Sequence, residues 1–160
     1  MTGQGNLARQ YREIDVKTAT PLQLIVMLYD TAIISVEEAL GHMDRKDIAS
    51  RSRSINHCGS ILTELQSCLD RKAGGEIAAS LDRLYDYMKR ILSQANAEQN
   101  PALLREAKGL LENLRSAWRQ ISVKTPMINR PSKHEDDTDI DFMGMYMPAE
   151  NNLKSFSISA

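Results

Sequence analysis

Histidine, cysteine and acidic residues are the side chains through which this chain could bind a metal ion or catalyse a reaction. The three histidines, His42, His57 and His134, are scattered, and none has a second His or Cys at the spacing of a zinc site. A lone histidine on a predicted helix, such as His57, is typical of a surface position. The sequence therefore predicts no metal site built on histidine.

A cluster of aspartates near the end of the chain resembles the start of a calcium-binding loop. Asp137, Asp139 and Asp141 alternate as such ligands do, but Phe142 stands where the loop needs glycine and Pro148 where it needs glutamate. The chain also lacks the Glu-x-x-His pair of di-metal helix bundles and the Gly-x-Ser-x-Gly turn of serine hydrolases. We therefore expect no metal, no cofactor and no enzymatic activity.

Length and composition indicate a binding protein that folds as one unit. A chain of 160 residues with 42% hydrophobic residues suffices for one domain, and no apolar run approaches the roughly 18 residues of a membrane span. The first six residues have neither the basic head nor the apolar segment of a secretory signal, so we expect the cytoplasm. A net charge of −1 does not favour nucleic acid or a membrane as partner. Recognition should rest on shape and apolar contact.

Four stretches have apolar residues three and four positions apart, which is typical of amphipathic helices. Thr20-Pro21 and Asn100-Pro101 supply a capping side chain followed by proline, as at helix starts. Gly74-Gly75 should separate the second helix from the third, since glycine tolerates the backbone of helix ends. The expected helices run from 21 to 43, from 44 or 47 to the glycine pair, from 76 to about 97, and from 101 to 124.

These helices predict an all-α fold, an antiparallel four-helix bundle, because short connections make successive helices neighbours. Residues 1–20 form an N-terminal lead-in, 21–124 the bundle, and 125–160 a mostly disordered acidic tail with three Lys and Arg against six Asp and Glu. Cys58 and Cys68 should share the second helix, roughly 15 Å apart, and stay reduced. The apolar stripes expected to face the core include Leu28, Ile48 and Leu84.

Three segments carry patterns that helix periodicity does not require. The first, residues 11–30, has a Val five positions after a Tyr (Tyr11 and Val16). It continues with Thr18-Ala19-Thr20-Pro21 and Met27-Leu28-Tyr29-Asp30. The others are Gly74-Gly75-Glu76-Ile77-Ala78 followed by Leu84-Tyr85-Asp86-Tyr87-Met88, and Trp118. In order and spacing they resemble the FliS family of flagellar secretion chaperones, over residues 11 to about 121. Two departures are Thr31, where the family usually has Gly, and the longer tail.

The resemblance implies a chaperone that binds the C-terminal segment of flagellin in the cytoplasm. Such a protein prevents premature polymerisation and assists delivery to the flagellar type III export gate, which is a second expected partner. Tyr11 and Val16 are implied partner contacts because the family's N-terminal segment lies at the substrate groove. Met27 and Tyr29 are further candidates, with core packing as their alternative. The alternative function is a helical-bundle adaptor or regulator-binding module of another pathway.

The tail is unusually rich in large adaptable apolar side chains. It holds both phenylalanines and four of the eight methionines of the chain. Because such side chains suit a hydrophobic groove, part of residues 140–158 is expected to fold back and shield the bundle, through Phe142, Met143, Met145 and Phe156. The alternative is a tail that stays disordered.

Overall fold

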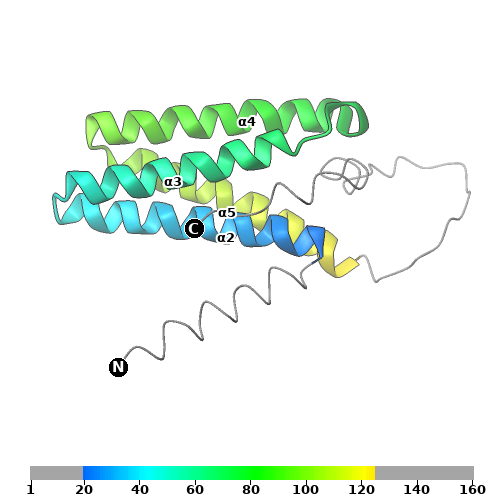
Figure 1. Ribbon diagram of the computed structural model, residues 1–160, viewed down its shortest axis with the longest axis horizontal. Coiled ribbons are helices and arrows are strands. Elements are labelled where there is room, and N and C mark those ends of the chain that lie inside the picture. Colours follow the sequence, from blue (N-terminus) through cyan, green and yellow to red (C-terminus); the bar gives the residue numbers. More distant parts are fainter. Residues whose placement is uncertain (1–19, 125–160) are drawn as a thin grey trace, which may run out of the picture.

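The computed structural model describes residues 20–124, which form four helices (Figure 1). These are α2 (Pro21–Asp44), α3 (Ile48–Ser67), α4 (Arg71–Glu98) and α5 (Pro101–Lys124). Within this range no residue lies in a strand. The predicted all-α four-helix bundle is confirmed. The division of the chain into a lead-in, a bundle domain over 21–124 and a tail stays a prediction. No helix among the described residues combines the length and apolarity needed to cross a membrane.

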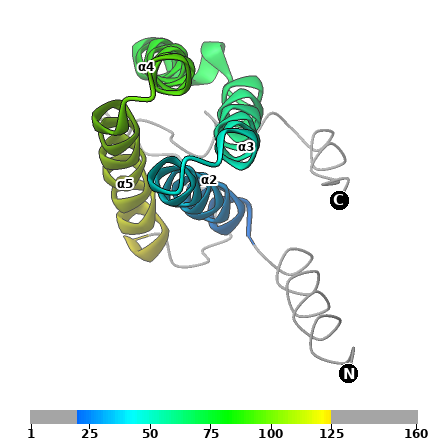
Figure 2. The same cartoon turned by 90° about the vertical axis from the view of Figure 1, so that its left-hand side faces the viewer.

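The helices are joined by connections of two or three residues, so each runs antiparallel to the next. Both α2 and α4 pack against α3 and against α5, so the order around the bundle is α2, α3, α4, α5 (Figure 2). The helix α5 begins beside α4 and ends away from it, on the side of α2. One end of the bundle is therefore more open than the other.

Two of the helix starts form as the sequence predicts. The Thr20 backbone N–H donates to Gln23 Oε1 at 2.8 Å, and Thr20 Oγ1 accepts from the Gln23 N–H at 3.3 Å. This reciprocal capping box satisfies two helix-end groups, and Pro21 occupies the first helical position. At the start of α5, Asn100 Oδ1 accepts from the Ala102 N–H at 3.0 Å. Polar caps thus set where α2 and α5 begin.

Helical geometry breaks at the predicted Gly74-Gly75, but the second helix ends earlier than expected. Helix α3 ends at Ser67, and α4 begins at Arg71, because Asp70 Oδ1 accepts from the N–H groups of Lys72 and Ala73 at 2.9 and 3.0 Å. Gly75 lies inside α4 with φ +49° and ψ −129°, so it kinks the first part of that helix. The apolar rhythm hid the earlier break, at residues 68–70, because Leu69 in that connection is also buried.

The core contains most, but not all, of the predicted stripes. Side chains with no exposed surface come from all four helices, among them Val36, Leu62, Met88, Leu104 and Leu111. Several stripe residues are only half-buried at the margin of the core: Leu28, Leu40, Ile77, Leu81, Leu84, Leu103, Leu110, Leu114 and Ile121. Ile48 is 59% exposed, which corrects its expected burial: it is the first residue of α3, beyond the packed part of the helix.

A buried guanidinium joins the start of α3 to the end of α4. Arg51 is only 4% exposed, its Nε donates to Asn96 Oδ1 at 2.9 Å, and its Nη2 donates to the Asn96 carbonyl at 3.2 Å. Asn96 is in the last turn of α4, where the helix dipole favours a positive charge. This contact closes the end of the bundle opposite the open one.

The two cysteines are free and differ in burial. Cys58 is fully buried in α3, and burial raises the pKa of its thiol to about 12. Cys68 follows the last residue of α3 instead of continuing the helix, and it is half-buried; burial is also the main cause that raises the pKa of its thiol.

We expect iodoacetamide to alkylate Cys68 well before Cys58 in the folded protein, because the reagent needs both access and a thiolate. Mass spectrometry of the intact protein and of its peptides would follow the two sites. Equal native rates would contradict the buried position of Cys58, and denatured protein, in which both should react, is the control.

Candidate partner-binding surfaces

The described histidines make ordinary side-chain contacts. His57 Nδ1 lies 2.9 Å from Ser35 Oγ, and His42 Nδ1 lies 3.1 Å from Arg45 Nη2. Among residues 20–124, no three His, Cys, Asp or Glu side chains gather as a metal site would require. His134 and the aspartates from Asp137 to Asp141 lie outside the described residues.

The Leu-Tyr-Asp pattern occurs twice, in α2 and in α4, and both copies build the fold. Tyr29 and Tyr85 are fully buried, and their hydroxyl oxygens are 2.5 Å apart across the centre of the bundle. The two helices on opposite sides of the bundle are thereby joined. Tyr29 is therefore placed in the core, the alternative that the sequence left open for it.

The aspartates of the same pattern point to the neighbouring helices. Asp30 accepts from Arg115 Nη1 at 2.8 Å and from Arg119 Nη2 at 3.2 Å, which ties α2 to α5. Asp86 accepts from Gln66 Nε2 at 2.9 Å, and this hydrogen bond is the main reason that the pKa of Asp86 lies below its ordinary value. The repeated pattern thus sets helix packing.

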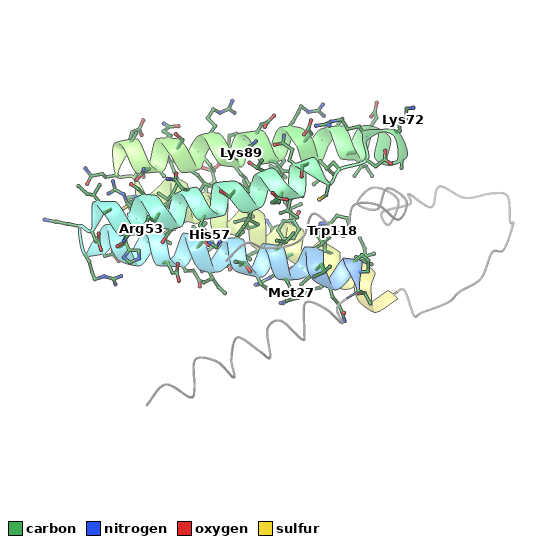
Figure 3. All side chains as sticks on the ribbon, viewed as in Figure 1. Met27, Arg53, His57, Lys72, Lys89 and Trp118 are labelled. Atoms are coloured by element: carbon green, nitrogen blue, oxygen red, sulfur yellow. The ribbon has the colours of Figure 1, made fainter. Side chains whose placement is uncertain are left out.

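The first apolar surface is the outer α2 stripe, which we define as Leu24, Met27 and Ile34. At about 100° per residue, Met27 and Ile34 point in nearly the same direction, and Met27 lies about 160° away from the buried Tyr29. Ile34 is 53% exposed, and Leu24 and Met27 are half-buried. Figure 3 shows Met27 at the edge of α2 that faces away from the other helices. The Met27 side chain is therefore partly accessible to a partner, and its role as a contact residue stays a prediction.

The second apolar surface is the α4–α5 seam, which we define as Ile77, Leu81 and Leu84 of α4 with Leu114 and Ile121 of α5. All five are half-buried and pack against the core. They lie in the half of α4 and the half of α5 that diverge from each other (Figure 2). Because these side chains are only half-buried, apolar surface remains on this side of the bundle that a further apolar segment can cover.

The two helices remain joined where they are close. Tyr87 of α4 donates its hydroxyl hydrogen to Glu106 Oε1 of α5, and this hydrogen bond is the first cause that raises the pKa of Tyr87. Arg90 lies over the Tyr87 ring, 5.4 Å from its centroid. The Tyr87–Glu106 hydrogen bond therefore lies on the face of α4 that is turned toward α5. Leu84 is one turn away from Tyr87 along α4.

A third surface is a groove of about 580 Å³ between α3 and α4. Ile55 and Leu92 contribute its apolar part, and Ser60, Thr63 and Asn96 are among its polar residues. A Cβ atom added at Gly59, also in the lining, would meet no other atom within 4 Å. Sequence reasoning missed this groove, because Gly59 gives no signal of open space within a helical pattern.

Comparison with known proteins decides the family. The sequence profile described as flagellar protein FliS matches residues 4–125, which is most of the chain and includes the whole bundle. The chain belongs to the FliS family. This membership confirms the resemblance drawn from the Leu-Tyr-Asp and Gly-Gly-Glu patterns.

Several relatives agree with this FliS assignment. The flagellar secretion chaperone FliS of Salmonella typhimurium is 39% identical over 113 residues, which cover 70% of this chain and 84% of the relative. The flagellar secretion chaperone FliSB of Pseudomonas aeruginosa is 34% identical, covering 71% and 94%. FliS of Bacillus subtilis is 33% identical, covering 69% and 81%. Because this FliS-family role is that of a chaperone, the chain is not an enzyme.

The remaining predicted site residues lie outside the described range. Tyr11 and Val16 precede it, and Phe142, Met143, Met145 and Phe156 follow it. Their roles stay predictions. The described residues form two separate apolar surfaces, the outer α2 stripe and the α4–α5 seam. Of their residues, the sequence singled out only Met27 as a contact.

Proposed function

We propose that this FliS-family chain binds the C-terminal segment of flagellin in the cytoplasm, prevents its premature polymerisation and assists its delivery to the flagellar export gate. The support is the combination of family membership with two apolar surfaces that the bundle leaves uncovered. A client that is disordered when free can fold onto such surfaces as amphipathic helices. The ordering of the client then offsets part of the gain from burial.

The outer α2 stripe is suited to one helix of such a client. Leu24, Met27 and Ile34 recur along one face of α2, as the anchors of helix-on-helix contacts do. The helix α2 carries four acidic residues, Asp30, Glu37, Glu38 and Asp44, and no Lys or Arg. A client helix with basic residues beside its apolar face would therefore be favoured there.

Tyr11, Val16 and Met27 are the contact residues that we propose. The first two precede α2 in the sequence, and Met27 lies two turns into that helix. Tyr29 contributes differently, because its buried hydroxyl holds α2 against α4 and so positions the stripe. The α4–α5 seam provides apolar area for a further part of the client.

Calorimetric titration of the full chain with the C-terminal segment of flagellin from the same cell tests the proposal. We expect a 1:1 complex, weakened several-fold by Met27→Asp, because a charge would be buried against apolar surface. Ala102→Asp is the matched control, since it adds the same charge at an exposed position at the other end of the bundle. Absence of binding by the unaltered chain would sink the proposal, and equal losses in both variants would remove Met27 from the site.

A further inference from the structure

Charge is distributed unequally over the bundle, and the α4–α5 seam lies in its basic part. The two segments that flank the seam, residues 71–84 and 110–124, carry six Lys and Arg against three Asp and Glu. Three of these basic side chains already pair with carboxylates, Arg71 with Asp82 and both Arg115 and Arg119 with Asp30 of α2. The remaining basic residues still outnumber the remaining acidic ones in these segments. In contrast, α2 is acidic and has no basic residue except His42. Lys72, at the start of α4, lies at the open end of the bundle (Figure 3). An acidic segment with apolar side chains would therefore favour the seam over the outer α2 stripe.

The chain itself contains such a segment. Residues 125–160 carry three Lys and Arg against six Asp and Glu, and five of the acidic residues fall between 135 and 141. Directly after them come Phe142, Met143, Met145 and Met147. Phenylalanine and methionine adapt well to a surface of half-buried leucine and isoleucine side chains.

The length and origin of this segment place the seam within its reach. Residues 125–139 can span up to about 50 Å when extended, whereas a helix of the length of α5 measures about 36 Å. The helix α5 ends at Lys124, three residues after Ile121 of the seam, at the end where α4 and α5 diverge. The segment therefore starts beside the surface that its composition suits.

We propose that residues 140–158 bind the α4–α5 seam of the same molecule when no client is present. Phe142 and the methionines cover Leu81, Leu84 and Leu114, while the preceding aspartates lie near the basic residues that flank the seam, such as Arg83. The contact shields apolar surface that would otherwise be open to a second molecule. This contact forms in the free chaperone, so it does not depend on the identity of the client.

Photo-cross-linking in the full chain tests this contact. With p-benzoylphenylalanine in place of Phe142, we expect intramolecular cross-links to peptides from residues 71–84 or 110–124. Leu84→Asp should cause loss of most of this yield, and Met27→Asp, which alters the other apolar surface, should leave it unchanged. Cross-links to α2, cross-links between two molecules, or none at all would each overturn the proposal in favour of another occupant or of a free tail.

Amide hydrogen exchange provides a measurement that does not require a change in the bundle. We expect slowed exchange at residues 142–147 in the unaltered chain, and faster exchange there when Phe142, Met145 and Phe156 are all replaced by serine. Exchange as fast as in an unfolded peptide in both proteins would contradict the contact. Because no flagellin is present, neither experiment is affected if the proposed client proves wrong.

Discussion

Replacement of Leu62 by alanine should lower the free energy of unfolding by about 2–5 kcal/mol, the usual range for a buried leucine that leaves a cavity. Leu62 has no exposed surface and lies in α3 among residues of the core cluster. Leu84→Ala is the matched comparison, because the same atoms are removed from a half-buried position. Its cost should be clearly smaller, since less surface leaves water there and the site can collapse.

Urea denaturation followed by circular dichroism measures both values, with the m-value as a check that the unfolding transition is unchanged. Equal costs for the two variants would mean that the α4–α5 seam is as closed as the centre of the bundle. That result would also remove the basis for proposing a ligand at the seam.

Local patterns predicted the fold well because helix formation depends largely on near neighbours. The proline-led starts at Thr20 and Asn100 are capped as expected, and the apolar spacing yields the four helices. The break between α3 and α4 was misplaced because two signals compete within eight residues. Asp70 caps α4 with two hydrogen bonds, whereas Gly75 only kinks it. Sequence alone does not rank a cap above a glycine pair.

The binding surfaces were harder to predict because they depend on how helices diverge in space. Leu62 and Leu84 occupy equivalent places in their apolar stripes, yet one is in the core and the other at its margin. The difference arises from the path of α5, which departs from α4 along the seam. No spacing of residues within a single helix encodes that departure.

The sequence pattern identified the family through residues that build the bundle. Tyr29, Tyr85, Asp30 and Asp86 are all engaged in packing or hydrogen bonds between helices. Such residues indicate which fold is present without marking where a partner binds. The proposed contact residue Met27 lies on a surface where several apolar side chains would serve, so its residue type carries less information.

Replacing Phe142, Met145 and Phe156 together by serine should tighten the binding of the flagellin C-terminal segment by about tenfold, if the α4–α5 seam is open in about a tenth of the molecules. The reason is competition, because a client that uses the seam must first displace the tail. Calorimetric titration of the full chain gives both affinities, and Met127→Ser, which removes a tail methionine outside residues 140–158, should leave the affinity unchanged. Equal affinities for the triple variant and the unaltered chain would show that client and tail do not compete. A chain that binds no flagellin in any form would instead refute the proposed client, whereas the cross-links from position 142 would still report on the tail.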